Sequence, residues 1–515
     1  MRKSVVILLL CVLAVHMLPA VAQKPLRIEI PAKEDTDPYN LVNCESMGAF
    51  VFFPTAQNIG KDSIVWSFHL FDKNLREKWN KGVGLDRSCL YVGSSYIAMD
   101  TIVYLLFRDD RKKEGTNTVI CTVNLRSSLV TELKGQLKSM ANVTHFDVAG
   151  NYAFISLQTI KKSEVDLCRM SLKTAEVSLF NIPEKDKSEI LDMAVNPSSR
   201  SISVITKTED NQIEMTVFGY DGNVMNAVDF RKMSGKKAIN TAEVIHTGKG
   251  KGLVFGVYGS ASERGWNSEI GDQTPLAAGY FAAGFEKGQQ TFVNYYNFSE
   301  FRDFFRYING NDAVRLKKRS FLKGKKDDKE RETALNYHML IHPVLQRDSS
   351  FVLAGEAYYP EYHTITNMMY DYYGRPIPTS YSVFDGFRYA VAFIASFDSL
   401  GTMRWSNGME MRGILTSLLN RKFSSAYDGG NLVMMYNAEG ALALKTIKGN
   451  EIIEQSAFTT IGMLHNNDKV VKDYLSTITP WYDNFYIAYG YHSIRNNDLS
   501  NSRRTVFYIN KIAYR

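Results

Sequence analysis

Short runs of alternating apolar and polar residues recur along the chain, and each leads into a tight polar turn. In the clearest case an apolar run enters the turn at Asp398 to Gly401 and another run leaves it, which is the pattern of a β-hairpin. Similar half-hairpins return at intervals of about fifty residues, close to the spacing of known blade repeats. These stretches begin at Phe71, Asn124, Ser171, Tyr220, Phe285, Phe397, Ile447 and Ile509.

The third repeat shows what one unit contains. Residues 143–149, 152–160, 164–172 and 176–182 form four short strand patterns separated by turn residues, and four strands per unit are typical of a β-propeller blade. The sequence therefore predicts an all-β protein, a β-propeller of about eight four-stranded blades. Seven blades are the alternative if one unit is misread, and two unrelated β-sandwiches are another.

The two ends of the chain complement each other. The last repeat reaches Arg515 without a fourth strand, while Leu26 to Ile30 form a strand pattern ahead of the first complete repeat. We expect this N-terminal strand to close the ring, because closure also removes an exposed sheet edge.

The extra residues fall on one side of the predicted ring. In an up-and-down blade the connections alternate between the two faces, so loops between second and third strands share a face with loops between blades. The long segments are all of these two kinds: 109–117, 260–276, 360–388 and 493–503 within blades, and 299–335 between the fifth and sixth repeats. Because loops on a rigid scaffold carry binding, this face is the predicted binding face.

The chain start has the features of a signal peptide. Residues 1–22 combine a basic start, an apolar run and a small-x-small cleavage site at Ala20 to Ala22. The remaining residues, 23–515, are expected to form one propeller domain with insertions at 299–335 and 360–388. No other apolar run approaches the roughly 20 residues of a membrane span, so an exported protein is expected, in the periplasm or associated with the outer membrane or cell surface.

Four cysteines follow the signal peptide, Cys44, Cys89, Cys121 and Cys168. An oxidising compartment permits disulfides, but Cys121 and Cys168 occupy matching third strands that splay apart beyond the limit of about 7 Å between Cα atoms. A Cys44–Cys89 bridge is the one pairing considered, and free buried thiols are favoured.

Composition is that of a globular protein, with 45% hydrophobic and 22% charged residues. Of the net charge of +7, +6 comes from one segment, 315–331, which has nine basic and three acidic residues. That segment lacks the interleaved aromatic residues of a nucleic-acid site, so no nucleic-acid partner is predicted. It is either a solvated loop or a contact for an anionic partner through Lys317, Lys318, Arg319, Lys325 and Lys326.

The segment 358–389 is rich in tyrosine, which offers a large contact area with a polar tip and suits protein or sugar surfaces. In the alternative interpretation the rings pack on one another and hold a long loop shut. The binding candidates are Tyr359, Tyr362, Tyr370, Tyr372, Tyr373, Arg375, Tyr381 and Arg388. Residues 298–308 predict a short amphipathic helix, with Phe301, Phe304, Phe305 and Ile308 on one side.

No catalytic set is found. Asp398 with Gly401 and Trp405 has a weak similarity to a sialidase Asp-box, and a turn-forming aspartate is favoured. His338 and His342 lie in a strand pattern without the glutamate of a zinc protease. We predict no cofactor and no metal. The alternative to a binding protein is a carbohydrate-active enzyme that uses the carboxylates Glu361, Asp371 and Asp385 with tyrosine platforms.

One region resembles a known group of proteins. The segments EAYYPEY (356–362), YDYYGRP (370–376) and FDGFRY (384–389), followed by FDSLG (397–401), look like those of uncharacterised exported proteins of Bacteroidetes-type bacteria. Gln23 after the cleavage site is similar to their usual mature start. The resemblance implies export and brings no established activity. Type IX secretion substrates of such bacteria usually end in a sorting domain, whereas the last strand here belongs to the predicted propeller.

Together these patterns favour a non-enzymatic binding or scaffold protein of the bacterial envelope. We expect it to bind a protein or a glycan through the long-loop face.

Overall fold

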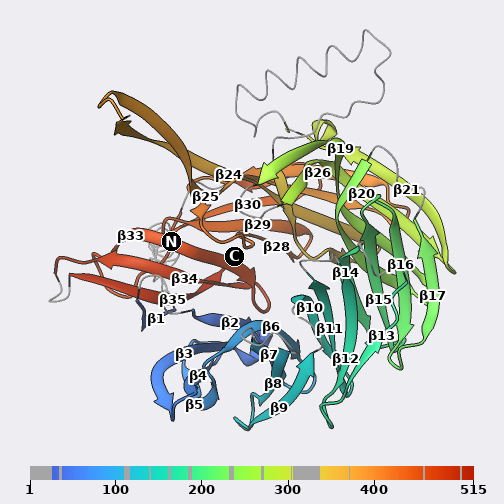
Figure 1. Cartoon of the computed structure of the whole chain (residues 1–515), viewed down its shortest axis with the longest axis horizontal. Helices are drawn as coiled ribbons and strands as arrows, with labels where there is room; N and C mark the ends of the chain where they lie inside the picture. The colour runs from blue at the N-terminus through green and yellow to red at the C-terminus, as the bar shows by residue number, and fades with distance from the viewer. Residues whose placement is uncertain are drawn as a thin grey trace, which may run out of the picture.

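The computed structural model describes residues 26–33, 38–109, 116–137, 141–159, 164–183, 188–230, 233, 237–267, 272–302, 304, 337–370, 372–455, 459–498 and 502–514. Its strands form eight antiparallel sheets, each built on four strands in sequence order. The sheets follow one another in chain order, and the first lies beside the last (Figure 1). This is the predicted eight-bladed β-propeller.

Each of the first four blades consists of four strands without an additional one. Blade 1 is β2 (Asn40–Asn43), β3 (Ala49–Ile59), β4 (Ser63–Phe71) and β5 (Glu77–Asp86), and blade 2 is β6 (Cys89–Ile97), β7 (Ile102–Asp109), β8 (Thr116–Asn124) and β9 (Val130–Leu137). Blade 3 is β10 (Ala141–Ala149), β11 (Tyr152–Thr159), β12 (Val165–Ser171) and β13 (Val177–Phe180), and blade 4 is β14 (Ser188–Asn196), β15 (Ser201–Thr208), β16 (Ile213–Gly219) and β17 (Val224–Asp229). The four strands of the third repeat are thus confirmed within a few residues.

The later blades carry the additions. Blade 5 is β18 (Lys237–Gly248), β19 (Lys251–Asn267), β20 (Asp272–Glu286) and β21 (Gln289–Asn297). Blade 6 is β22 (His338–Ile341), β24 (Ser350–Tyr370), β25 (Pro376–Phe397) and β26 (Met403–Glu410), joined by β23 (Leu345–Arg347) and β27 (Leu415–Thr416). Blade 7 is β28 (Phe423–Asp428), β29 (Asn431–Ala438), β30 (Ala441–Lys448) and β31 (Glu451–Gln455), joined by β32 (Thr459–Thr460).

Blade 8 closes the ring in the predicted way. It combines β33 (Lys469–Pro480), β34 (Phe485–Arg495) and β35 (Arg503–Ala513) with the N-terminal strand β1 (Arg27–Pro31). β1 pairs antiparallel with β35, with Ile28 opposite Ile509. The N-terminal and C-terminal strands therefore meet in one sheet. The edge of β35 that faces β1 is paired and not exposed.

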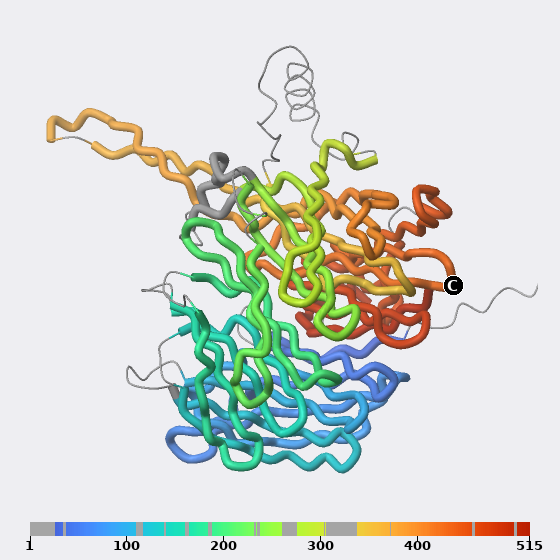
Figure 2. Tube along the Cα trace, turned by 90° about the vertical axis from the view of Figure 1, so that its right-hand side faces the viewer, coloured from blue at the N-terminus to red at the C-terminus, as the bar shows by residue number. Residues whose placement is uncertain are grey.

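The long connections lie on one face, as predicted. Every turn between first and second strands or between third and fourth strands is short, and the long segments all belong to the other face. Two of the predicted loops, 260–276 and 360–388, are not loops, however. The first continues the ladder of β19 and β20 to the pair Asn267 and Asp272. The segment 360–388 is the longer of the two. It continues the ladder of β24 and β25 as a two-stranded ribbon that projects from the ring (Figures 1 and 2).

The predicted amphipathic helix at 298–308 is wrong where the structure describes it. A 3-10 helix, η3 (Phe298–Glu300), is followed by extended backbone at Phe301. Phe298, Phe301 and Phe304 are nevertheless buried, packed with Phe393 between blades 5 and 6. Phe305, Ile308 and the basic residues of 315–331 lie outside the described residues. A second 3-10 helix, η1 (Glu45–Met47), is equally short, and none of the described helices has the length and apolar character of a membrane span.

Apolar side chains fill the space between neighbouring blades, in clusters that each draw on adjacent sheets. The four cysteines belong to this packing: all are buried and none forms a disulfide. The favoured interpretation of free thiols is therefore confirmed. Burial raises the pKa of the Cys168 thiol to about 12, which makes it unreactive at neutral pH.

Buried carboxyl groups add a second connection between blades. Asp192 of blade 4 accepts the Val244 N–H of blade 5 at 2.8 Å, and Glu243 of blade 5 accepts the Val344 N–H of blade 6 at 3.0 Å. Further round the ring, Glu356 of blade 6 accepts the main-chain N–H groups that open blade 7, and Asp473 of blade 8 accepts from the tight turn of blade 7. Each bond satisfies a backbone donor that the strand ladders leave over.

The Asp192 carboxyl predicts a pH dependence. Burial raises its pKa to about 7, against the opposing effect of the Val244 hydrogen bond. Since the folded chain then holds a proton that the unfolded chain releases near pH 4, this group makes unfolding easier as pH rises from about 4 to 7. Asp192→Asn keeps an acceptor for Val244 and removes the titration. We expect its melting temperature, relative to wild type, to rise by about 2 °C or more between pH 5 and pH 8.

The exposed Asp210→Asn, in the same blade, is the matched control and should follow the wild-type curve. An Asp192→Asn curve parallel to wild type across this range would contradict the assignment.

Candidate functional site

The projecting ribbon of blade 6 is the most distinctive surface feature of the described chain. We call it the arm and define it as residues 361–385. Its ladder starts above the pair Pro360 and Phe387 and ends at the pair Tyr370 and Pro376. The arm grows from blade 6 because the period-2 alternation of β24 and β25 continues beyond the point where their neighbours stop. Its tip lies far from the body of the ring in both views (Figures 1 and 2).

The register sorts the arm's side chains onto two faces, since directly opposite residues of an antiparallel pair share a face. One face carries pairs of directly opposite hydroxyl side chains. In one pair, the side-chain oxygens of Thr366 and Ser380 are 3.0 Å apart. The other face is the apolar face of the arm. It presents Ile365 opposite Tyr381 and Met369 opposite Ile377.

Most large apolar side chains of the arm are open to solvent, on both of its faces, and Ile365 is half-buried. The exposed large hydrophobic residues of the arm are Tyr362, Met368, Met369, Tyr370, Tyr372, Tyr373, Ile377 and Tyr381. Tyr372 at the tip is 97% exposed. Exposed apolar side chains concentrated on one element are unusual in a soluble protein and often mark a contact site. The arm therefore has the composition of a contact surface.

The predicted binding residues divide into two groups. Tyr370, Tyr372, Tyr373, Arg375 and Tyr381 lie on the distal arm, where Arg375 covers the Tyr373 ring at 5.6 Å. Tyr359, Tyr362 and Arg388 belong to its base. There Tyr359 contacts the Tyr337 ring at 5.6 Å and Tyr362 contacts Phe384 at 5.5 Å. The alternative in which the rings hold the segment together thus describes the base, and contact with a partner suits the tip.

Sequence reasoning missed Met368, Met369 and Ile377. Ile377 had a signal, because with Tyr381 and Val383 it alternates with Ser380 and Ser382. Met368 and Met369 are adjacent in the sequence, so alternation did not indicate both. The segment was predicted to be a loop because it contains two prolines and is rich in tyrosine.

The carboxylates of the enzyme alternative are already engaged. Arg388 binds both oxygens of Glu361, and His363 Nδ1 lies 2.6 Å from Asp385 Oδ1. The Arg388 hydrogen bond lowers the pKa of Glu361, whereas a glycosidase acid needs a raised one. Asp371 lies outside the described residues.

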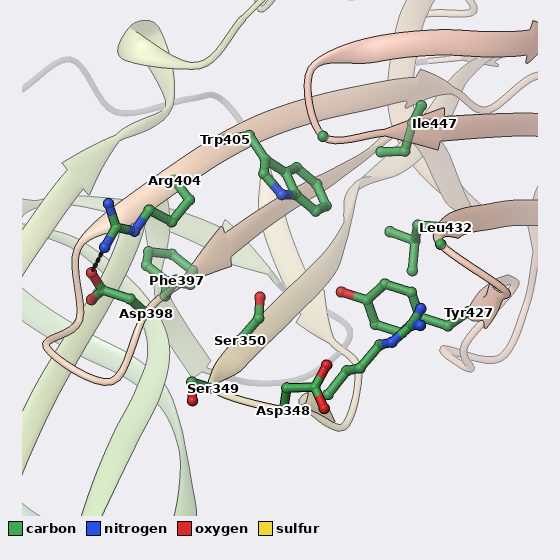
Figure 3. Close-up of a pocket in the computed structure, with 13 residues that line it drawn as sticks. Asp348, Ser349, Ser350, Phe397, Asp398, Arg404, Trp405, Tyr427, Leu432 and Ile447 are labelled. Atoms are coloured by element: carbon green, nitrogen blue, oxygen red, sulfur yellow. Dashed lines mark ion pairs between the residues drawn. The ribbon is translucent and has the colours of Figure 1, made fainter.

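The face of the ring opposite the long connections has short turns. It holds a cavity of about 520 Å³ between blades 6 and 7 (Figure 3). Trp405 and Tyr427 line it, and Arg347 covers the Tyr427 ring at 4.9 Å. Asp398 pairs with Arg404 at 2.6 Å on its rim. Short turns gave no sign of this hollow, because it arises from the spacing of two blades. Asp398 also accepts the Leu400 and Thr402 N–H groups, which is the expected turn-forming role.

A buried polar network links blades 6, 7 and 8. Lys422, 2% exposed, donates from Nζ to the Ser476 carbonyl at 2.8 Å. Burial lowers its pKa to about 8, although the nearby Asp473 and Glu356 carboxylates act to raise it. The small cavity beside it, of about 20 Å³, has room for a water molecule and not for a substrate. We interpret the network as structural.

The two histidines singled out in the sequence are part of the core. His338 packs on the Tyr358 ring at 5.5 Å, and burial lowers its pKa. His342 pairs with the buried Glu356. Across the residues that the structure describes, no group of three or more His, Cys, Asp or Glu side chains is placed to hold a metal ion.

No protein-family model and no curated protein matches the sequence. Solved structures to which the chain is similar include the β-propeller domain of the trilobed protease from Pyrococcus furiosus, with 10% identity, a TM-score of 0.36, and coverage of 83% of this chain and 98% of that one. A periplasmic gluconolactonase of Pseudomonas aeruginosa has 9% identity and a TM-score of 0.36, with coverage of 80% and 96%. The polysaccharide lyase Uly1 has 8% identity and a TM-score of 0.37, with coverage of 94% and 100%.

The exposure of the arm tip predicts that its tyrosines do not stabilise the fold. Tyr372→Ala should change the free energy of unfolding by less than about 0.5 kcal/mol, as surface substitutions usually do. Tyr389→Ala removes a ring that is 2% exposed and should cost about 3 kcal/mol. Urea denaturation of both variants checks this. A Tyr372→Ala loss as large as that of Tyr389→Ala would mean that the tip rings hold the arm together.

Proposed function

We propose that this chain is a binding or scaffold protein of the bacterial envelope, and that the arm, on the long-loop face, is its contact element. The observation that supports it most is the apolar face of the arm, where Ile365, Met369, Ile377 and Tyr381 lie without a covering element among the described residues. A ring with short turns on one face and a projecting ribbon on the other presents that ribbon to a partner.

A protein partner fits the arm better than a glycan. Methionine and isoleucine side chains offer apolar area to another apolar surface, and methionine adapts its shape to a partner. Sugar sites depend more on flat aromatic platforms with charged groups beside them. The charged residues of 364–382 are Asp371 and Arg375, between β24 and β25, and the apolar face that carries Ile365 and Met369 has none. A glycan is therefore the second choice.

The envelope location rests on the sequence. The signal-peptide pattern of residues 1–22 and the resemblance of residues 356–401 to exported proteins support export. A periplasmic or outer-membrane-associated position is part of the proposal. The basic segment 315–331 remains a candidate contact for an anionic partner.

Capture from envelope extract tests the proposal. The mature protein carrying Met369→Ser, Tyr372→Ser and Ile377→Ser should recover its partner at least tenfold less than wild type, because each change removes apolar area from the contact. Wild-type capture should change little between 0.1 M and 1 M salt, since apolar contacts are not screened.

The control variant carries Leu129→Ser, an exposed leucine in the β8 to β9 turn on the opposite face, and should recover as much as wild type. Equal recovery by the arm variant and the control would refute the role of the arm. A steep loss with salt would instead favour the basic segment.

A further inference from the structure

Among the strands that the structure describes, none covers the outer edge of β24 in the arm. Within blade 6, β22 pairs with β24 only as far as Tyr358. The described chain ahead of β22 begins at Tyr337, whose carbonyl accepts the Ala277 N–H of blade 5 at 3.0 Å. From Glu361 to Tyr370, β24 pairs with β25 and with no other described strand. An edge of this length that no described strand pairs with presents a row of N–H and C=O groups that can add another strand.

The other edge of the arm is blocked. Pro376 and Pro378 occupy alternate positions of β25, opposite Tyr370 and Met368. Alternate N–H groups of a strand point to the same side, and the ladder to β24 continues without a shift through both prolines. The missing donors therefore belong to the outer edge of β25. Proline at an edge prevents strand addition, whereas β24 has no proline beyond Pro360.

The β24 edges of two copies of the chain can pair with each other. No residue from Thr364 to Tyr370 is charged, so a second copy of the strand meets no repulsion there. In an antiparallel pair centred on Thr366, that residue lies opposite its equivalent. Thr364 then lies opposite Met368, and Tyr362 opposite Tyr370, which places two aromatic pairs at the ends of the contact.

We infer that two copies of this protein pair antiparallel through the β24 edges of their arms, about a two-fold axis near Thr366. A two-stranded ribbon is marginally stable in water, and the pairing converts two ribbons into one four-stranded sheet. A two-fold contact uses the same edge twice and therefore closes at the dimer. The inference uses the edge of the arm, while the proposed function uses its apolar face and tip, so either can fail alone.

A matched pair of proline variants tests the edge. Thr366 and Ser380 are directly opposite and share the alternation of Pro376 and Pro378, so the N–H groups of both face outward. Thr366→Pro removes a donor from the open edge, and Ser380→Pro removes one from the edge already blocked. By sedimentation velocity of the mature protein over a range of concentrations, wild type and Ser380→Pro should dimerise. Thr366→Pro should weaken the dimer at least tenfold.

A second measurement does not depend on the proline variants. Under oxidising conditions Thr366→Cys should give a disulfide-linked dimer, since facing residues of an antiparallel pair lie within the Cα separation that a disulfide spans. Ser380→Cys should not. Wild type that stays monomeric at every concentration, equal weakening by the two proline variants, or equal cross-linking at the two positions would each overturn the inference. Loss of partner capture by the arm-face variant with an unchanged dimer would affect only the proposed function.

Discussion

The ring exists because one strand pair joins the two ends of the chain. β1 and β35 complete blade 8, and Arg27 of β1 is the residue that fastens them. Its guanidinium donates to Glu29 and Asn510, both at 2.8 Å, and lies 4.6 Å from the centre of the Tyr508 ring. A buried charge is tolerated only where such partners surround it. Without this closure, blade 8 would present the open edge of β35, and blades 1 and 8 would expose the apolar side chains they share.

Carboxyl groups hold much of the remaining ring together. From blade 4 onward, buried acidic side chains reach across to main-chain N–H groups of the neighbouring blade, as Asp192 and Glu356 do. The early blades rely more on apolar contacts that include Cys44, Cys89 and Cys121. With the ring secured in these ways, packing contacts of the arm are found mainly at its base, as between Tyr362 and Phe384. The distal residues are mostly exposed, which is why they point to a partner.

Much of the fold could be predicted from the sequence because its signals are local. Polar turns such as Asp398 to Gly401 recur at a regular spacing. The last repeat lacked a fourth strand, and the strand pattern around Ile28 could supply it. The arm was harder to predict from the sequence. Pro376 and Pro378 are typical of a loop when the partner strand is unknown. The cavity beside Trp405 and the carboxyl bonds between blades depend on contacts between residues far apart in the chain. Local pattern cannot supply these.

Site-specific photo-crosslinking in envelope preparations tests the central claim, that the arm is the contact element. A photoreactive phenylalanine analogue replaces Tyr372 at the arm tip in one variant and Leu129 on the opposite face in another, both positions being exposed. We expect a discrete cross-linked product from position 372 and none from position 129. Equal products from both positions, or a product from position 129 alone, would contradict it.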